Sequence, residues 1–382
     1  MKFTPWYNKN HKILLVIPVA LILFSFFYMV YFYQQNNDFL KRDVSLTGGT
    51  SITIKTDISA TELKSKISDQ FPDMDIRTLA DNSGKQTHLI ITVPDSKEKI
   101  VSVLESALSI TLDEENSSIE YTRGSLGQEF YKQLLTSMFF AFLLMGLVVF
   151  LTFGESKLIK VYTSILTLIA LKLTFPTISQ ISFIFFLVII VVFFYGLYIA
   201  KSKKHRLLLT GLFVVAIFLS FFPYYPLIFL IAVICLTLYT LYSAPSIAVL
   251  ISAFADIIFT VVTVNMMGMK VSSGGIVAFL MLIGYSVGTD VLLTSRVLRR
   301  KHESVNSACF GAFKTGITMT LTAITSIFIG LLFVYRYETI LNQIFIIILI
   351  GLLYDILNTW LTNVLIIKWY AESRDKYDVQ IK

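Results

Sequence analysis

The sequence is poor in the residues from which catalytic and metal centres are most often built. Its 382 residues include only 2 cysteines and 4 histidines. Cys235 lies in an apolar run and Cys309 in a basic loop, so they indicate neither a disulfide framework nor a metal site. No histidine falls in the centre of a predicted helix, and the motifs His-Glu-x-x-His and Gly-x-Ser-x-Gly are absent. An intramembrane enzyme is therefore the least favoured function, and we expect neither catalytic residues nor a cofactor.

The chain also lacks the basic aromatic platform with which proteins bind nucleic acid. Its net charge of +7 is unevenly placed. Residues 34–129 carry 16 acidic and 10 basic side chains, whereas the rest of the chain carries 9 acidic and 22 basic ones. The basic excess therefore belongs to loops between apolar runs, where positive charge marks the cytoplasmic side of a membrane. Nucleic acid is not an expected partner.

Long apolar runs dominate the chain. Hydrophobic residues make up 55% of it and the mean hydropathy is +0.72, more than a soluble core can use, so a polytopic membrane protein is predicted. The first run, residues 13–31, is close to the about 20 residues that span a bilayer. A cleaved signal peptide is the alternative, but the run is long and no small-x-small cleavage site follows it. We therefore expect residues 1–33 to hold a cytoplasmic amino terminus and an uncleaved first transmembrane helix.

The pattern of residues 34–129 predicts a soluble domain outside the cytoplasm. Ser59 is placed to cap a helix with Glu62 at its third position, and the alternation of apolar and polar residues is typical of half-buried strands. The resulting βαββαβ order is that of a ferredoxin-like domain. The predicted elements are a strand at 44–55 broken by a glycine pair, a helix at 60–71, strands at 74–79 and 88–93, a helix at 96–110 and a strand at 118–122.

A second apolar run, within residues 130–153, returns the chain to the cytoplasm. Residues 154–242 then hold four further apolar runs, some of them slightly shorter than the about 17 residues at the low end for spanning. We expect four transmembrane helices here, because an even number keeps the flanking helices correctly oriented. Residues 243–368 hold the remaining membrane helices, and residues 369–382 form a polar cytoplasmic tail.

Three acids lie in these last membrane helices. Asp256 and Asp355 are predicted near the middle of their helices, and Asp290 nearer the cytoplasmic end, while Asn358 shares a helix face with Asp355. Because a carboxylate at the bilayer centre costs roughly 2.5–3.5 kcal/mol on insertion scales, intramembrane acids are functional by default. No lysine or arginine lies at comparable depth in these helices. The acids are thus candidates for a proton relay or for hydrogen-bonded helix contacts, and the sequence leaves both roles open.

The helix that carries Asp290 has small residues on one face. Gly284 and Gly288 are four residues apart, so they predict close approach of another helix, together with Tyr285 and Ser286. The bland alternative is that the glycines only pack helices and that Asp290 lies in the interface. Three basic residues follow and predict a cytoplasmic anchor: Arg296, Arg299 and Arg300. A stripe of hydroxyls in the next helix is also expected to turn toward other helices: Thr318, Thr322, Thr325 and Ser326.

These motifs together resemble the SecF family of protein-export membrane proteins. The carriers of the resemblance are Ile283-Gly284-Tyr285-Ser286, the segment Thr47-Gly48-Gly49-Thr50 after the first helix, and Gly351–Trp360 in the last helix. The glycine pair alone is weak evidence, because by pattern it indicates only a bulge or a close backbone approach. The combination is specific, and it is similar to the archaeal type of the family.

The resemblance implies a fold, a function and partners. The expected fold is a polytopic α-helical membrane protein, a SecD/SecF-like bundle of the resistance-nodulation-division superfamily, with one ferredoxin-like extracytoplasmic α+β domain. The implied function is that of an accessory subunit of the Sec translocase that promotes late steps of export and is coupled to the proton gradient in bacterial members. The implied partners are SecD, a SecY-type channel, translocating polypeptides and the lipid bilayer. With ten helices, both termini are expected in the cytoplasm.

The chain also departs from the family pattern. Ser45 and Leu46 replace the usual Asp and Phe before the glycine pair, and residues 154–242 have no counterpart. Archaeal-type members usually have acids at the positions of both Gly288 and Asp290, and here only Asp290 is an acid, which weighs against direct proton coupling through this helix. The alternative function is a proton-driven small-molecule exporter of the same superfamily, which usually has two six-helix halves and two large outer domains.

Overall fold

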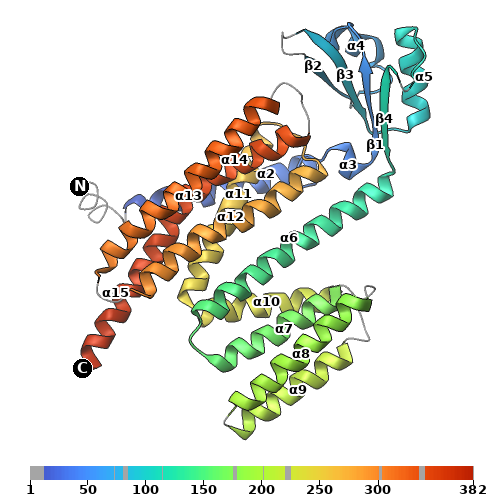
Figure 1. Ribbon diagram of the computed structural model, residues 1–382. Coiled ribbons are helices and arrows are strands. Elements are labelled where there is room, and N and C mark those ends of the chain that lie inside the picture. The colour runs from blue at the N-terminus through green and yellow to red at the C-terminus, as the bar shows by residue number, and fades with distance from the viewer. Residues whose placement is uncertain are drawn as a thin grey trace.

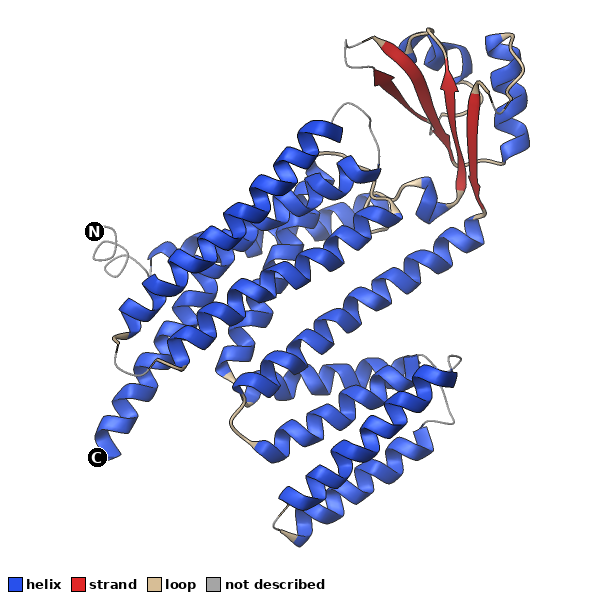
Figure 2. Cartoon of the chain, in the orientation of Figure 1, coloured by secondary structure: helices blue, strands red, loops and turns tan. Residues whose placement is uncertain are grey.

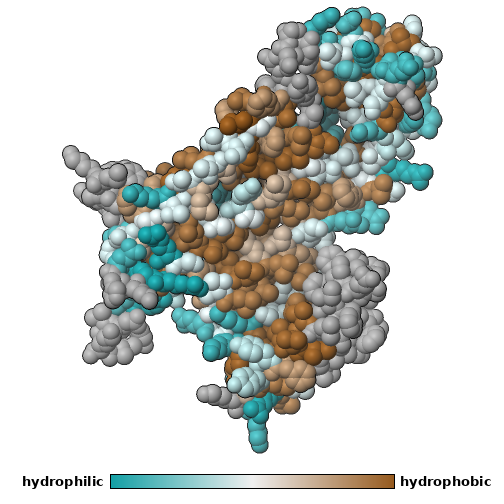
Figure 3. All heavy atoms as spheres, in the orientation of Figure 1, coloured by the Kyte–Doolittle hydropathy of each residue, from teal (hydrophilic) through white to brown (hydrophobic). Residues whose placement is uncertain are grey.

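The computed structural model shows a bundle of long helices with a small α+β domain at one end (Figures 1 and 2). It describes residues 13–72, 74–80, 85–113, 115–174, 179–200, 202–219, 225–300, 303–334 and 340–381. Hydrophobic residues cover much of the visible helix surface, whereas hydrophilic ones gather on the α+β domain and at the opposite end (Figure 3). This distribution is the one expected of a bundle embedded in lipid between two aqueous phases.

The α+β domain has the predicted ferredoxin-like order. Its sheet is antiparallel with strand order β2-β3-β1-β4, and the two helices pack on one face around a core that includes Ile52, Leu63, Leu89 and Ile100. Ser59 caps the first helix, because its Oγ accepts from the Glu62 backbone N–H at 3.2 Å. The elements are β1 (Gly49–Lys55), α4 (Ala60–Ile67), β2 (Asp75–Ala80), β3 (Gln86–Val93), α5 (Lys97–Leu108) and β4 (Ser117–Thr122).

One element of this domain was predicted wrongly. Val44–Thr47 is a short helix, α3, and the strand begins only at Gly49. The Asp43 carboxylate accepts from the Val44 backbone N–H at 2.8 Å and so starts the helix. Gly48 then ends it at φ 86°, a conformation that a residue with a side chain rarely adopts. The glycine pair is therefore a joint between helix and strand and not a bulge within a strand.

The same glycines seat the domain on the next long helix, α6 (Gly124–Phe153). A Cβ atom on Gly48 would lie 2.3 Å from the Gly124 Cα, and one on Gly127 would lie 2.9 Å from the Gly48 backbone nitrogen. Thr50 completes the joint, since its Oγ1 donates to the Asp95 carbonyl at 2.7 Å. The motif Thr47-Gly48-Gly49-Thr50 thus has a packing role, which is to let two backbones approach closely.

Six helices among the described residues are long and apolar enough to cross a membrane. Ten spans were predicted, and six helices satisfy the length and composition of a span. The last of these spans continues without a break through a π-helical turn, η2. The elements are α2 (Val16–Asn36), α6, α11 (Ala244–Met266), α12 (Ser273–Leu298), α13 (Val305–Val334), and α14 (Ile340–Asn358) continued by η2 (Thr359–Asn363) and α15 (Val364–Ile381).

The inserted segment forms four helices that pack beside α6 (Figure 1). Their contact with α6 centres on Tyr239, whose ring lies 5.3 Å from that of Phe150 and fills the space above Gly146. The Tyr239 hydroxyl and the Thr167 hydroxyl lie 2.6 Å apart inside the inserted unit. The four helices are α7 (Lys157–Thr174), α8 (Ser179–Ile199), α9 (Lys203–Leu219) and α10 (Tyr225–Leu241).

The ends of the membrane helices nearest the α+β domain hold the segment that leads into the sheet. The Val271 backbone N–H donates to the Lys41 carbonyl at 2.6 Å, and its carbonyl accepts from the Asp43 N–H at 2.9 Å. The Lys270 ammonium lies 3.7 Å from the Asp75 carboxylate at the start of β2. Gln343 on α14 accepts from the Ser272 N–H at 2.9 Å. The domain is therefore linked directly to the helices that carry the acids.

Candidate functional site

Three membrane helices bring the three predicted acids together. Asp256 lies on α11, Asp290 on α12 and Asp355 on α14, and all three side chains are at most 1% exposed. The sequence predicts Asp290 nearer the end of its helix than the other two acids. In the structure it lies close to the helix that carries Asp355, because Thr359 and Asn363 donate to it. Each acid has a polar partner at the helical spacing of four residues on its own helix: Ser252 with Asp256, Ser286 with Asp290, and Thr359 with Asp355. This spacing gives each helix one polar face, and the three faces meet in the bundle.

The Asp256 carboxylate links all three helices. Ser286 on α12 donates to its Oδ2 at 2.5 Å, and Asn358 on α14 donates to its Oδ1 at 2.6 Å. Ser286 and Asn358 thus connect two helices to a third, and their common acceptor is Asp256.

Asp290 and Asp355 share a second set of donors. Asn363 and Thr359 donate to Asp290 Oδ1 at 2.6 and 2.8 Å, and Ser252 lies 3.5 Å from the same oxygen. Thr359 also lies 3.3 Å from Asp355 Oδ1, so its hydroxyl stands between the two acids. Thr289 donates to Asp355 at 3.1 Å. In the part of the chain that the structure describes, the side-chain donors to the three acids are hydroxyls and amides.

The π-helical turn η2 lies at this centre. It spans Thr359–Asn363 directly after Asn358, and Thr359 and Asn363 at its two ends both reach Asp290. Because π-helical turns inside α-helices occur frequently at functional sites, this irregularity supports a role beyond packing. The turn was not predicted, although the polar run Asn358-Thr359 with Thr362-Asn363 in an apolar helix was the available signal.

The centre also contains buried acceptors without partners. Asp290 Oδ2, Asn358 Oδ1 and Asn363 Oδ1 make no hydrogen bond among the described residues. An unpaired buried acceptor is costly, typically about 1–3 kcal/mol, so all three atoms are suited to accept a hydrogen bond, and Asp290 Oδ2 can also take up a proton. Chemically, the cluster offers three carboxyls, linked through hydroxyls that both donate and accept.

The small-residue face of α12 turns outward. A Cβ atom on Gly284 or Gly288 would meet nothing within 4 Å, and Tyr285 is 46% exposed. The expectation that these two glycines admit a neighbouring helix is therefore not met within the described chain. Ser286 and Asp290 on the opposite face supply the reason, since their hydrogen bonds orient that face toward the bundle.

The hydroxyl stripe of α13 also differs from the expectation. Thr318, Thr322, Thr325 and Ser326 are exposed, and each hydroxyl donates to a carbonyl three or four residues earlier in the helix. These internal hydrogen bonds satisfy the hydroxyls without a neighbouring helix. The face turned inward carries Gly316 instead, over which the Trp360 ring packs.

The predicted cytoplasmic anchor is partly tied to neighbouring helices. Arg300 pairs with Asp375 on α15 and donates to the Val297 carbonyl at 2.6 Å. The Arg296 guanidinium lies over Gly311 of α13, where a Cβ atom would be 2.5 Å away. Arg299 is exposed. The basic cluster thus joins three helix ends and does not reach the acids.

The helices of this site lie in a part of the chain that is similar to known proteins. Residues 214–373 match the family model described as protein export membrane protein SecD/SecF, C-terminal. This part of the chain is therefore similar to polytopic membrane proteins of the SecD/SecF type.

Within that class, the relatives are SecF proteins. The chain is 45% identical over 133 residues to the protein-export membrane protein SecF of Methanothermobacter thermautotrophicus, covering 34% of this chain and 46% of that protein. It is 44% identical over 136 residues to SecF of Methanocaldococcus jannaschii, covering 35% of this chain and 48% of that protein. The chain thus spans about half the length of the curated relatives it matches, and the predicted resemblance to SecF is confirmed for this part.

Among solved structures, the chain is similar to SecDF, a translocon-associated membrane protein from Thermus thermophilus. The TM-score is 0.48 at 12% identity, and the match covers 96% of this chain and 38% of that chain. A second structure, SecDF in a super-membrane-facing form, gives a TM-score of 0.44 at 11% identity, with 98% and 40% covered.

Proposed function

We propose that the chain is a SecF-like, non-enzymatic accessory subunit of the Sec protein-export translocase that acts with SecD to promote late steps of translocation. The observation that carries this proposal is the identity of 45% over 133 residues with a protein-export SecF. The family match over residues 214–373, which include the three acids, supports it. The relatives are named for protein export, so the alternative of a small-molecule exporter is not favoured. The further partners are a SecY-type channel and translocating polypeptides.

The outward face of α12 is the proposed contact with SecD. Gly284 and Gly288 leave the backbone open over one helical turn, and Met281 and Tyr285 flank them with exposed side chains. In lipid, where no hydrophobic force drives helices together, such small-residue faces allow close van der Waals packing. Ser286 and Asp290 lie on the opposite face of the same helix, so a partner there would affect the geometry of the acid cluster.

The acid cluster is the proposed site of coupling to the proton gradient. Asp256, Asp290 and Asp355 are buried and linked by hydroxyls, which is an arrangement that supports proton relays in membrane proteins. Both termini are proposed to be cytoplasmic, with residues 34–129 outside. This orientation puts the basic loops Lys201–Arg206 and Arg296–Lys314 inside, as the positive-inside rule requires.

Copurification from native membranes tests the proposal. The tagged full-length chain should bring down SecD, and the channel under mild solubilisation. Recovery of neither protein, from membranes that contain both, would contradict the assignment as a translocase subunit.

A further inference from the structure

The turn before the last strand of the α+β domain carries a sequence motif that the proposed function does not use. In Asn116-Ser117-Ser118 an asparagine is followed by a hydroxyl two residues later, which is the acceptor motif for N-linked glycosylation. None of the other asparagines in the sequence has serine or threonine two residues later. Because so short a motif also occurs by chance, its place in the fold decides whether a sugar can be attached.

Asn116 lies at the end of the domain that is remote from the membrane helices. β4 pairs with β1 from Ser117, opposite Ile54, to Thr122, opposite Gly49, and α6 begins two residues after Thr122. The 6 residues of β4 rise about 3.3 Å each, so Asn116 is about 20 Å from the start of α6. Figure 1 shows β4 running from the far side of the domain to α6. A bulky hydrophilic group on Asn116 would therefore not meet the lipid.

The turn holds the Asn116 side chain at the surface of the domain. Its Oδ1 accepts from the Asp113 backbone N–H at 3.0 Å, and its Nδ2 donates to the Thr111 carbonyl at 2.8 Å. Thr111, Asp113 and Glu115 are exposed, and Asn116 itself is half-buried. A side-chain amide has two N–H donors, so a sugar that replaces one hydrogen leaves the other to bond to Thr111. The turn can thus keep both hydrogen bonds after modification.

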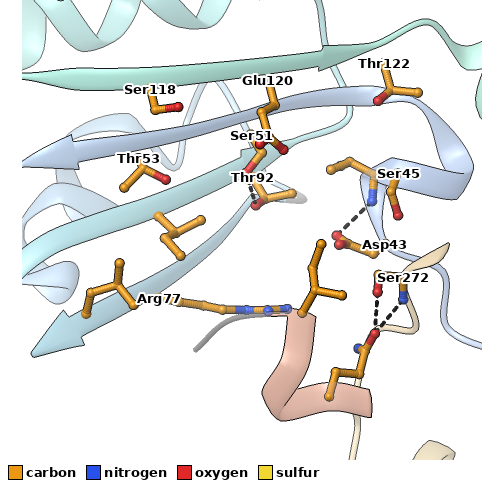
Figure 4. Close-up of a pocket in the computed structure, with 15 residues that line it drawn as sticks. Asp43, Ser45, Ser51, Thr53, Arg77, Thr92, Ser118, Glu120, Thr122 and Ser272 are labelled. Carbon is orange, nitrogen blue, oxygen red and sulfur yellow. Dashed lines mark hydrogen bonds between the residues drawn. The ribbon is translucent and has the colours of Figure 1, made fainter. Parts of the chain in front are cut away.

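The second half of the motif is also accessible. Ser118 is exposed on β4, which is an edge strand, and lies on the same face of the sheet as Glu120 (Figure 4). An edge strand has backbone groups that are not paired within the sheet, so another protein can hold this segment in an extended form. The Ser117 hydroxyl, in contrast, donates to the Asp113 carbonyl at 2.7 Å and belongs to the turn.

We propose that Asn116 is a site of N-linked glycosylation, at which a separate membrane enzyme attaches an oligosaccharide carried on a lipid phosphate. The Asn116 Nδ2 forms a bond to the anomeric carbon of the first sugar, and the bond from that carbon to the phosphate oxygen breaks. The phosphate leaves with the electron pair of that bond and the amide gives one proton to a base, so nothing is oxidised or reduced. The proposal goes beyond the export function and rests on the orientation that puts residues 34–129 outside, because glycans of this type are attached to exported surface segments.

Mass spectrometry of the full-length chain, purified from its native membranes, tests the proposal. Trypsin releases residues 100–123 as one peptide, in which Asn116 is the only asparagine. We expect this peptide to carry an oligosaccharide, and fragmentation that retains the sugar should place it on Asn116. The unchanged chain should also migrate more slowly in gel electrophoresis than Asn116→Gln does.

Variants of the two serines separate modification from a structural role of the asparagine. Ser118→Ala removes the motif but neither hydrogen bond of the Asn116 side chain, so the glycan should be lost. Ser118→Thr keeps a hydroxyl at this position and should keep the glycan. Ser117→Ala is the matched control, because it removes a hydrogen bond of the turn and leaves the motif intact, and it should be modified as the unchanged chain is.

The outcomes distinguish this proposal from the proposed function. An unmodified peptide, a glycan on one of its serines or threonines, or a glycan that persists in Ser118→Ala would overturn the proposal. Labelling of a single cysteine at Ser102 in intact cells reports the orientation separately, and copurification reports the association with SecD. An unmodified Asn116 in a chain that passes both of these tests contradicts the glycosylation site alone.

Discussion

Asn358 on α14 donates a hydrogen bond of 2.6 Å to the Asp256 carboxylate on α11, across 102 residues of sequence. Both side chains are fully buried. The other carboxylate oxygen accepts from Ser286 on α12, so one acid holds three helices in register. Removal of either donor should therefore weaken the contact between one pair of helices and leave the other pair connected.

Asn358→Ala should destabilise the bundle by about 1 kcal/mol, because one oxygen of Asp256 then loses its donor; hydrogen bonds between membrane helices typically contribute about 0.6–2 kcal/mol. Thermal unfolding of the purified protein in detergent measures the change. Thr325→Val is the matched control, since Thr325 is exposed and bonds only to its own helix. An equal effect of both substitutions would show that Asn358 does not link the helices.

Gly48→Ala should disrupt the packing of the α+β domain against α6. The added methyl group would lie 2.3 Å from the Gly124 Cα and would also strain a backbone at φ 86°. Gly268→Ala separates the two effects, because Gly268 has φ 71° and open space around it. We expect Gly268→Ala to cost about 1–2 kcal/mol, the usual price of this conformation, and Gly48→Ala distinctly more.

Limited proteolysis and thermal unfolding of the full-length chain measure both variants. Protease cleavage near residues 37–48 should increase only for Gly48→Ala. Equal destabilisation by the two substitutions would show that Gly48 is needed for its backbone conformation and not for close packing against α6.

The sequence predicted most elements of the α+β domain, because the alternation of apolar and polar residues, helix caps and turn residues act locally. The helix over Val44–Thr47 was missed since its cap, Asp43, and its termination at Gly48 override a short apolar alternation. The acids themselves were predicted from their cost in lipid. Their meeting was not, because it depends on how α11, α12 and α14 pack, and spacing along one helix does not determine this.

The outward direction of Gly284 and Gly288 could not be predicted either. A small-xxx-small pattern shows that one face is narrow, but not whether the neighbour comes from the same chain. The polar residues on the opposite face were the missing clue, because Ser286 and Asp290 must face protein. The same reasoning applies to α13, where hydroxyls that bond to their own helix need no partner.

Gly288→Leu should reduce SecD recovered by pull-down while folding is kept. The leucine side chain would project from a face with nothing within 4 Å, so it blocks only an external partner. Gly316→Leu is the control, since a Cβ atom there would lie 2.6 Å from the Trp360 ring and should lower the amount of folded protein. Equal loss of SecD and of folded protein in Gly288→Leu would contradict an external contact.

Single cysteines map the proposed orientation in a background without Cys235 and Cys309. Probes at Ser202 and Ser304 should be shielded from impermeant maleimides in intact cells, whereas Ser102 on α5 should react. The reason is that Ser202 and Ser304 lie in loops rich in lysine and arginine, and such loops favour the cytoplasmic side of the membrane. Labelling at Ser202 in intact cells would refute the four-span interpretation of the insertion.

The role of the three acids is tested by asparagine. Asparagine keeps the size and hydrogen bonding of aspartate but cannot titrate. In Asp256→Asn, the Asn358 amide can flip and present its otherwise unpaired Oδ1, so the contact between α11 and α14 survives. In Asp290→Asn, the Asn363 amide can flip in the same way and accept from the new amide. In Asp355→Asn, the hydroxyls of Thr289 and Thr359 can rotate and accept instead of donating. We therefore expect all three variants to fold and to copurify with SecD as well as the unchanged chain does.

Export in membrane vesicles, with and without an uncoupler, then distinguishes a relay from a structural cluster. If protons pass through the cluster, Asp256→Asn and Asp355→Asn should lose the uncoupler-sensitive part of export and keep the remainder. Asp375→Asn is the control, because Asp375 pairs with Arg300 at the end of the bundle and not with the acids. Full uncoupler-sensitive export by both variants would show that the acids are structural. Their burial would then be explained by the hydrogen bonds that hold the helices together, since Asp256 joins α11, α12 and α14 through uncharged donors.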